Sequence, residues 1–238
     1  MKKRMFDLTI CVLTAPIWIP MLITTALAIW FCEGFPIYYV SERRVWRNHS
    51  LRVIKFRTMV VNAEQIANRD TVPLQGVRFL NIPLDSPLYT PVGRLIERWH
   101  LTELPQFLHV LTGQMSVVGN RPLPENVLTS LKEVYPQAAD RFLVKAGVTG
   151  LVQLIGRDNL PDEVRLALEI EYCRAVEQRY SVRLDLHIVL LTILITLGLH
   201  SPLSVQEGFS LIRRHAWTHC NSLVGREKVD IPGTRKTR

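Results

Sequence analysis

Cysteine is scarce in this chain, and its four cysteines are not spaced for a metal cluster. They are Cys11, Cys32, Cys173 and Cys220, and no two of them form a Cys-x-x-Cys pair. A disulfide-stabilised secreted domain or a zinc-binding module would need a more regular pattern. The sequence therefore indicates a protein of a reducing compartment whose fold depends on an apolar core.

Signatures of nucleic-acid binding are also missing, although the chain is basic. The 238 residues carry a formal net charge of +8, yet they contain neither zinc-finger spacing nor an aromatic-rich RNA-binding pattern. A basic balance without these signatures favours anionic lipids and phosphorylated substrates as partners. We therefore expect no nucleic acid among the partners.

Charge is almost absent from residues 8–32, which follow a basic tripeptide at residues 2–4. The run is too long for the apolar part of a signal peptide, and no small-x-small cleavage site ends it before Glu33. It is long enough to cross a bilayer as a helix. However, Pro16 and Pro20 each lack a backbone donor, so a bend is expected between its two halves.

Two membrane topologies fit this segment: a kinked span, or a helix–break–helix that enters the membrane and returns to the same side. Residues 2–4 are basic, and so are Arg43, Arg44, Arg47 and Arg52 beyond the apolar run. A spanning helix normally has more Lys and Arg on its cytoplasmic flank than on the other, and this segment has positive charge on both flanks. We therefore predict a re-entrant anchor over residues 1–34.

Two short strands are predicted after the anchor. Residues 35–40 and 51–59 have strand-like composition, and the basic segment 41–48 between them is expected to be a turn. In such a hairpin Lys55 and Arg57 project from the same face. That face is either a solvated basic surface or a clamp for phosphate.

Helical patterns dominate the rest of the chain. Expected helices cover residues 91–99, 101–111, 161–179 and 184–199, with another after Pro202. The apolar helix at 184–199 is short for a span and is expected to lie in the membrane interface. The sequence thus predicts a mainly helical α+β fold: one domain at 35–200 with a small hairpin and interfacial amphipathic helices, then a helical extension with a basic tail at 201–238.

A carboxylate beside a proline stands between a basic and a glycine-rich segment. Glu103 lies in Leu101-Thr102-Glu103-Leu104-Pro105-Gln106. Arg94 and Arg98 precede this stretch, and a turn-rich run at 113–122 follows it. Arginine pairs with phosphate, Glu offers Mg²⁺ a hard oxygen, and Gly admits an anion close to the backbone. A solvated Glu explains the pattern as well, and Thr102 also fits a helix N-cap.

Several motifs together carry a family resemblance. They are Lys3-Arg4-Met5-Phe6-Asp7, Lys55-Phe56-Arg57-Thr58-Met59, Thr90-Pro91-Val92-Gly93-Arg94, Glu103-Leu104-Pro105-Gln106, Met115-Ser116-Val117-Val118-Gly119, Arg121-Pro122, Gly147-Val148-Thr149-Gly150-Leu151, Gly156-Arg157 and Leu184-Asp185-Leu186. In this order, over roughly residues 2–199, they resemble the bacterial sugar transferases, the monotopic phosphoglycosyl transferases that act on polyprenyl phosphate.

The resemblance implies an activity and a location. Such enzymes transfer a sugar-1-phosphate from a UDP-sugar to undecaprenyl phosphate at the cytoplasmic face of the bacterial inner membrane, and UMP is released. They use Mg²⁺, which the glutamate corresponding to Glu103 helps to hold. The product begins the assembly of an exopolysaccharide, capsule, O-antigen of lipopolysaccharide or other glycan. A homodimer or a complex with other polysaccharide-assembly enzymes is left open.

The basic residues of the matched motifs are candidate phosphate ligands. We expect four arginines beside Gly and Pro turns to neutralise the diphosphate and the lipid phosphate, with Lys55 and Arg57 in support. The four arginines are Arg94, Arg98, Arg121 and Arg157. A surface salt bridge is the alternative role for each of them.

This chain departs from the family at the nucleophile. The family has an Asp, which carries a covalent phosphosugar, directly before the glutamate; here the residue is Thr102. Three alternatives follow: another nucleophile such as Glu103 or Thr102, direct transfer between the two phosphates, or a catalytically weak partner that binds substrate or lipid. Further departures from the family pattern are His109, Gln114, Asn120, Val152 and Glu169.

Overall fold

The computed structural model describes residues 1–66, 82–156 and 160–216 of the chain. The predicted basic tail from residue 217 onward and Arg157 lie outside the described residues. The helices are α1 (Lys2–Glu33), α2 (Ala63–Ile66), α3 (Pro91–Arg98), α4 (Gln106–Leu111), α5 (Glu125–Val134), the 3₁₀ helix η1 (Pro136–Phe142), α6 (Leu151–Ile155), α7 (Asp162–Gln178), α8 (Val182–Thr196) and α9 (Val205–Ala216). The strands are β1 (Tyr38–Trp46), β2 (His49–Phe56), β3 (Ser116–Val118) and β4 (Gly147–Thr149).

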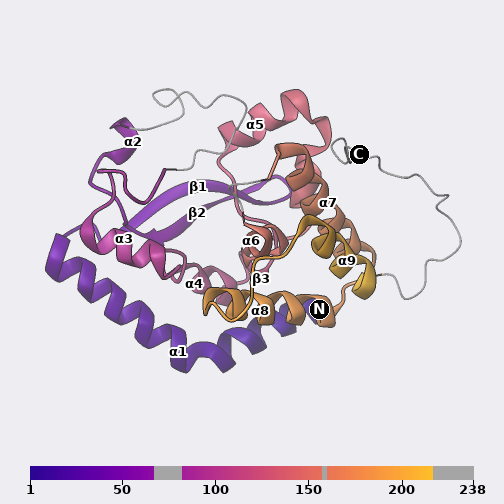
Figure 1. Ribbon diagram of the computed structural model, residues 1–238, viewed down its shortest axis with the longest axis horizontal. Helices are drawn as coiled ribbons and strands as arrows, with labels where there is room; N and C mark the ends of the chain where they lie inside the picture. Colours follow the sequence, from indigo (N-terminus) through magenta and orange to yellow (C-terminus); the bar gives the residue numbers. More distant parts are fainter. Residues whose placement is uncertain (67–81, 157–159, 217–238) are drawn as a thin grey trace, which may run out of the picture.

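This architecture confirms the mainly helical α+β prediction. The strands β1 and β2 form an antiparallel hairpin, while β3 and β4 form a short parallel pair. Figure 1 shows the hairpin across the middle of the molecule, with α5 on one side and α1 and α8 on the other. The predicted hairpin is present, and helices surround it.

The turn predicted at residues 41–48 is wrong in extent. Strand β1 continues through this basic segment to Trp46, and only Arg47 and Asn48 form the turn. Val45 is 4% exposed and Val53 is fully buried. Burial of these apolar side chains holds the basic segment in the ladder, because a strand sends alternate residues to the core and to the other face.

The helix α1 is continuous and bent rather than broken. Its assignment runs through Pro16 and Pro20, and Figure 1 shows the ribbon changing direction between its two halves. The expected bend is therefore present, but the predicted break is not. The indole of the buried Trp18 donates a 3.0 Å hydrogen bond to the carbonyl of Cys11, one turn before the first proline. The contact links the turn before Pro16 to the segment between the two prolines, where the helix bends.

The first turn of α1 is held by the rest of the domain. Lys3 donates to the carbonyl of Val118 at 2.9 Å, and the Arg4 guanidinium donates to backbone carbonyls at the end of α4. The Asp7 carboxylate accepts from the Ser116 hydroxyl at 2.8 Å and the Val117 amide at 2.9 Å. These contacts tie the N-terminus of α1 to β3 and α4.

The last turn of α1 is held by the same domain. The Glu33 carboxylate accepts from the Val92 amide at 3.1 Å and lies 3.7 Å from the Arg57 guanidinium. Arg57 also donates to the carbonyl of Gly34 at 3.1 Å. Both ends of a 32-residue helix, about 48 Å long, therefore contact one domain.

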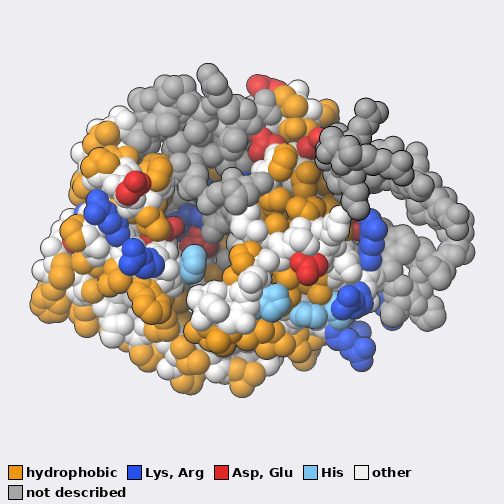
Figure 2. Space-filling view, in the orientation of Figure 1, with side chains coloured by type: hydrophobic (Ala, Val, Ile, Leu, Met, Phe, Trp, Pro, Cys, Tyr) orange, Lys and Arg blue, Asp and Glu red, His pale blue; other side chains and the backbone are white. Residues whose placement is uncertain are grey.

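Large apolar side chains remain exposed on α1 and α8. Those at least 40% exposed include Val12, Leu13, Ile17, Ile19, Ile23, Leu27, Trp30 and Phe31 of α1, and Leu186, Leu190 and Ile193 of α8. Figure 2 shows apolar side chains along the lower edge of the molecule, where Figure 1 places these two helices. An apolar surface of this extent marks a site of membrane or protein contact.

Candidate active site

The Glu-Leu-Pro-Gln motif lies in a series of tight turns and not inside a helix. Helix α4 begins at Gln106, and its N-cap is Pro105, so the prediction that Thr102 caps this helix is wrong. The Thr102 hydroxyl instead donates to a carboxylate oxygen of Glu97 at 2.5 Å. The Thr102 carbonyl accepts from the Phe56 amide at 3.0 Å, which fastens the motif to the end of β2.

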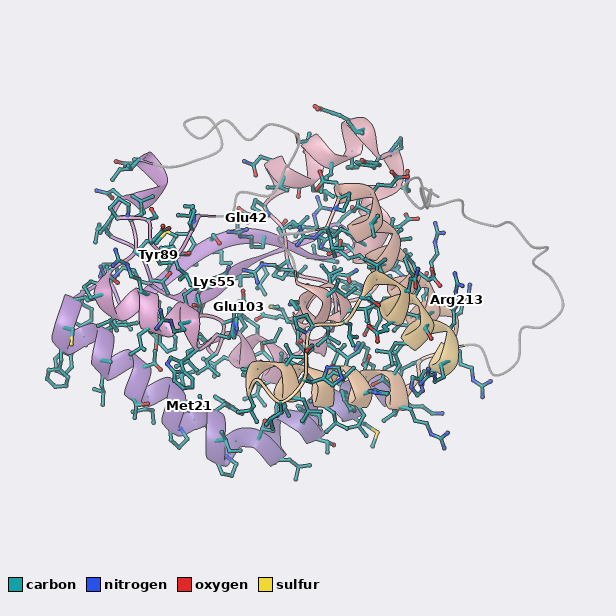
Figure 3. All side chains as sticks on the ribbon, viewed as in Figure 1. Met21, Glu42, Lys55, Tyr89, Glu103 and Arg213 are labelled. Carbon is teal, nitrogen blue, oxygen red and sulfur yellow. The ribbon has the colours of Figure 1, made fainter. Side chains whose placement is uncertain are left out.

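Glu103 is the centre of a cationic cluster. Its Oε1 contacts Nη1 of Arg121 and lies 3.8 Å from Nζ of Lys55. The three side chains are between 14% and 24% exposed, so water still reaches them. Figure 3 labels Lys55 and Glu103 close together at the end of the hairpin, and Figure 2 shows a hollow with acidic and basic side chains at that position.

Arg43 is a further member of the cluster that the sequence analysis missed. The hairpin register pairs Lys55 with Tyr39 and Arg43 with Leu51, so Arg43 and Lys55 project from the same face. Burial, and then the charge of Arg121, lowers the pKa of Arg43 to about 10, while the Glu103 carboxylate opposes the shift. Arg43 therefore remains charged at pH 7 and lies near both residues. The alternation of the basic segment was the signal that could have found it.

Arg165, from α7, is a second cation near the cluster. Burial lowers its pKa, the nearby Glu169 raises it, and the charges of Arg141 and Arg121 lower it further. Its Nε lies 3.8 Å from Glu169. Arg165 adds positive charge near Arg121. No sequence pattern pointed to Arg165, because it lies 44 positions after Arg121 in the chain.

Close backbone packing positions Arg121. A Cβ at Gly119 would lie 2.4 Å from the carbonyl oxygen of Lys145, so only glycine permits the strands to approach here. The next residue, Asn120, is 4% exposed and donates to the carbonyls of Arg141 and Glu169, each at 2.9 Å. Asn120 is one of the departures from the family pattern, and its hydrogen bonds hold the chain where it leads into Arg121.

Two other departures from the family pattern form a structural contact. His109 Nδ1 lies 3.0 Å from the amide oxygen of Gln114, and its Nε2 accepts from the Ile54 amide at 3.3 Å. The pair therefore links α4 to β2 and to the turn before β3. These substitutions support the frame of the site and do not enter the cluster around Glu103.

The structure does not bring every predicted phosphate ligand together. Arg57 is 8% exposed, and its guanidinium donates to the carbonyls of Pro36 and Gly34 at 2.6 and 3.1 Å. The prediction that Lys55 and Arg57 project from one face of the hairpin is therefore wrong, because Arg57 lies beyond the end of β2 and contacts the end of α1. Arg94 and Arg98 are exposed on α3, where Arg94 donates to the Ser86 carbonyl at 3.3 Å.

Comparison with known proteins identifies the family. The family model described as "Bacterial sugar transferase" matches residues 1–198. The chain is 32% identical to the exopolysaccharide production protein ExoY of Sinorhizobium fredii, over 81% of this chain and 84% of that protein. It is 34% identical to the undecaprenyl-phosphate glucose phosphotransferase of Komagataeibacter xylinus, over 81% of this chain and 35% of that protein.

A relative from Escherichia coli has a more specific description. The chain is 32% identical to its UDP-glucose:undecaprenyl-phosphate glucose-1-phosphate transferase, over 80% of this chain and 39% of that protein. Among the described residues, α1 is long and apolar enough to cross a membrane. The lipid in the relatives' names and this helix both indicate a membrane protein. With the family model matched from the first residue to the end of α8, the chain belongs to the bacterial sugar transferase family.

Proposed function

We propose that this protein transfers a sugar-1-phosphate from a UDP-sugar to undecaprenyl phosphate at the cytoplasmic face of the bacterial inner membrane, and thereby begins the assembly of a surface polysaccharide. The observation that carries the proposal is the cluster of Arg43, Lys55 and Arg121 around Glu103. Three cations around one carboxylate leave a net positive site. Such a site suits the phosphates of both substrates.

The proposed role of the cations is to neutralise charge. A nucleotide diphosphate approaching a lipid phosphate meets strong repulsion, and phosphoryl transfer depends mainly on positioning and charge stabilisation. Arg121 can bind two phosphate oxygens at once, whereas Lys55 acts as a point charge. Binding of the diphosphate would draw these two cations from Glu103 and release its carboxylate. Arg94, Arg98 and Arg157 stay predicted ligands for the outer phosphate oxygens.

Mg²⁺ fits the donors of this site if the substrate contributes ligands. Within the described residues, no group of three or more His, Cys, Asp or Glu could hold a metal alone. Glu103 offers a carboxylate, and Gln106 is 1% exposed with no hydrogen-bond partner for its side-chain amide in the described part of the chain. Magnesium is commonly held by one or two protein oxygens together with substrate phosphates and water. Glu103 and Gln106 would hold the ion, which would neutralise the diphosphate.

The anchor would bring this site to the lipid. Each CH₂ of a polyprenyl tail contributes about 0.8 kcal/mol to staying in the bilayer, so the enzyme must work at headgroup depth. The contacts of both ends of α1 with one domain support a re-entrant anchor, because a span would separate those ends. The exposed apolar faces of α1 and α8 would then lie in the cytoplasmic leaflet.

A second function is favoured by Thr102. A hydroxyl is a weak nucleophile unless a base takes its proton, so a chain without the family Asp could bind UDP-sugar or lipid and assist another transferase. The partner would then be a second copy of this chain or another polysaccharide-assembly enzyme. This alternative predicts tight binding of UMP without turnover.

A UMP-release assay distinguishes the two functions. Purified protein is incubated with a panel of UDP-sugars, undecaprenyl phosphate and Mg²⁺, and wild type is compared with Glu103→Gln. We expect release by wild type and at least about a 100-fold loss in Glu103→Gln, because the variant loses the charged group at the centre of the site. Glu133→Gln is the matched control, since Glu133 is exposed on α5. Absence of release by wild type with every donor would overturn the transferase proposal.

A further inference from the structure

A second carboxylate stands beside the position that the family nucleophile would occupy. Glu97 lies in the last turn of α3 and is half-buried, and its Oε2 accepts the hydroxyl hydrogen of Thr102 at 2.5 Å. The hydrogen bond from Thr102 thus places a carboxylate other than that of Glu103 next to the motif. It is the feature of the site that the proposed binding of substrate leaves unused.

The chain reversal after α3 fixes this arrangement. His100 has a φ of 56°, a left-handed conformation, and the Leu101 amide donates to the Ile96 carbonyl at 2.9 Å. The reversal returns the chain along the last turn of α3, so Thr102 comes back beside Glu97. The carbonyl of Thr102 is also held by β2. Thr102 is thus fixed by the backbone on both sides, and its hydroxyl orients the Glu97 carboxylate.

We propose that Glu97 supplies the reacting carboxylate of this protein, with Thr102 as a positioning residue. This inference rests on the proposed function. An oxygen of Glu97 attacks the phosphorus that carries the sugar, a new O–P bond forms, and the anhydride bond to UMP breaks. The product is a glutamyl phosphosugar. An oxygen of undecaprenyl phosphate then attacks the same phosphorus, the bond to Glu97 breaks, and the carboxylate is restored.

The chemistry of the bonds favours Glu97 over Thr102 as the nucleophile. The reaction breaks one phosphoric anhydride and makes another. A carboxylate forms a mixed anhydride, which keeps the phosphorus activated for the second step. A threonine would form an ordinary phosphodiester, whose leaving alkoxide is far more basic, so the sugar phosphate would remain on the protein. Glu97 therefore supports turnover where Thr102 supports only its first half.

The surroundings of Glu97 also suit a charged nucleophile. The buried Tyr89 has its pKa raised to about 12, first by burial and then by the negative charge of Glu97. The phenol therefore stays neutral and does not compete as a base near pH 7. The cations Arg121 and Lys55 pair with Glu103. In this proposal they bind the phosphates while Glu97 attacks.

Trypsin separates the two candidate nucleophiles, which makes the site of attachment measurable. Cleavage after Arg94 and Arg98 places Glu97 in the peptide of residues 95–98, while Thr102 and Glu103 fall in residues 99–132, because Arg121 precedes a proline. Wild-type protein is mixed with a UDP-sugar that supports UMP release, and the lipid acceptor is left out. Hydroxylamine is then added, which converts a glutamyl phosphate into a stable hydroxamate. We expect the hydroxamate in the 95–98 peptide. A hydroxamate or phosphosugar in the 99–132 peptide, or no adduct in either peptide, would overturn the assignment.

Variants test the same point by turnover. We expect Glu97→Gln to lower UMP release at least about 1,000-fold, and Glu97→Gln with Thr102→Asp to recover release, because a carboxylate returns to the neighbouring position. The recovered double variant shows that Gln at position 97 permits folding. Glu133→Gln again serves as the control. UMP release by Glu97→Gln within about threefold of wild type would contradict this inference without contradicting the transferase function. An inactive wild type would contradict both.

Discussion

Lys3 Nζ lies 2.7 Å from Oδ2 of Asp185, an ion pair that joins the first turn of α1 to α8. The Asp185 side chain is fully buried, and its other oxygen accepts from the Tyr172 hydroxyl at 2.8 Å. The anchor and the neighbouring apolar helix are therefore coupled by a buried polar network. The residues of two short motifs, 182 positions apart, form one structural contact.

The first prediction concerns this network. Asp185→Asn should lower the free energy of unfolding by about 3 kcal/mol, because Lys3 would lose its buried partner charge. Asp140→Asn is the control, since Asp140 pairs with Arg174 at 2.9 Å on the surface and should cost less than about 1 kcal/mol. Denaturant unfolding in detergent measures both variants. Equal losses would show that the buried pair has no special role.

The second prediction concerns nucleotide binding. Arg121→Ala should weaken UMP binding about 10- to 100-fold, because a charge-assisted hydrogen bond to phosphate contributes about 1.5–3 kcal/mol. Arg213→Ala is the matched control: Arg213 is 67% exposed and lies 3.7 Å from Glu171 on the surface. Titration calorimetry measures both affinities. Unchanged affinity in Arg121→Ala would exclude this residue from the phosphate site.

The third prediction separates Lys55 from Arg57. Arg57→Met should lower stability by about 2 kcal/mol, because the Glu33 carboxylate, whose side chain is 8% exposed, loses the guanidinium 3.7 Å away. The same variant should bind UMP within about twofold of wild type, whereas Lys55→Met should lose about tenfold in affinity. Denaturant unfolding and titration calorimetry on both variants test these opposite effects on stability and UMP affinity. Loss of UMP affinity in Arg57→Met at normal stability would restore the clamp predicted from sequence.

The fourth prediction concerns the topology of α1. Single-cysteine variants carry either Lys2→Cys or the exposed Cys32, with the remaining cysteines replaced by serine. An impermeant maleimide should label both from the cytoplasmic side of inside-out vesicles, because both ends of α1 contact one domain. Ile17→Cys, in the bent middle of the helix, should be protected by lipid. Labelling of the two ends from opposite sides would establish a span.

The fifth prediction concerns pH. His215 of α9 lies with its Nε2 3.2 Å from Nδ1 of His187 of α8, and burial, His187, Arg214 and Arg183 lower its pKa, in that order. The unfolded chain therefore binds more protons than the folded chain below about pH 6.5, so stability falls as pH decreases through that value. The drop in melting temperature between pH 7.5 and 5.5 should be smaller in His215→Gln. The exposed His49→Gln should leave the drop unchanged.

Much of the fold was predictable because it depends on patterns that are local in the chain. The apolar run with Pro16 and Pro20 predicted a bent helix, and the alternation near residue 53 predicted a hairpin strand. The error in β1 arose where basic side chains masked an alternating strand. Val45 is buried there, yet its charged neighbours have the composition of a turn.

The sequence alone determined the family and the order of the motifs, and it predicted a role for Glu103, since these depend on residue types and their spacing. The tertiary structure decided which cations surround Glu103, that both ends of α1 contact one domain, and that Glu97 meets Thr102. These contacts depend on strand register, on a chain reversal at His100 and on helix packing. Residues distant in sequence become neighbours only through such long-range geometry, and no local pattern encodes the resulting distances.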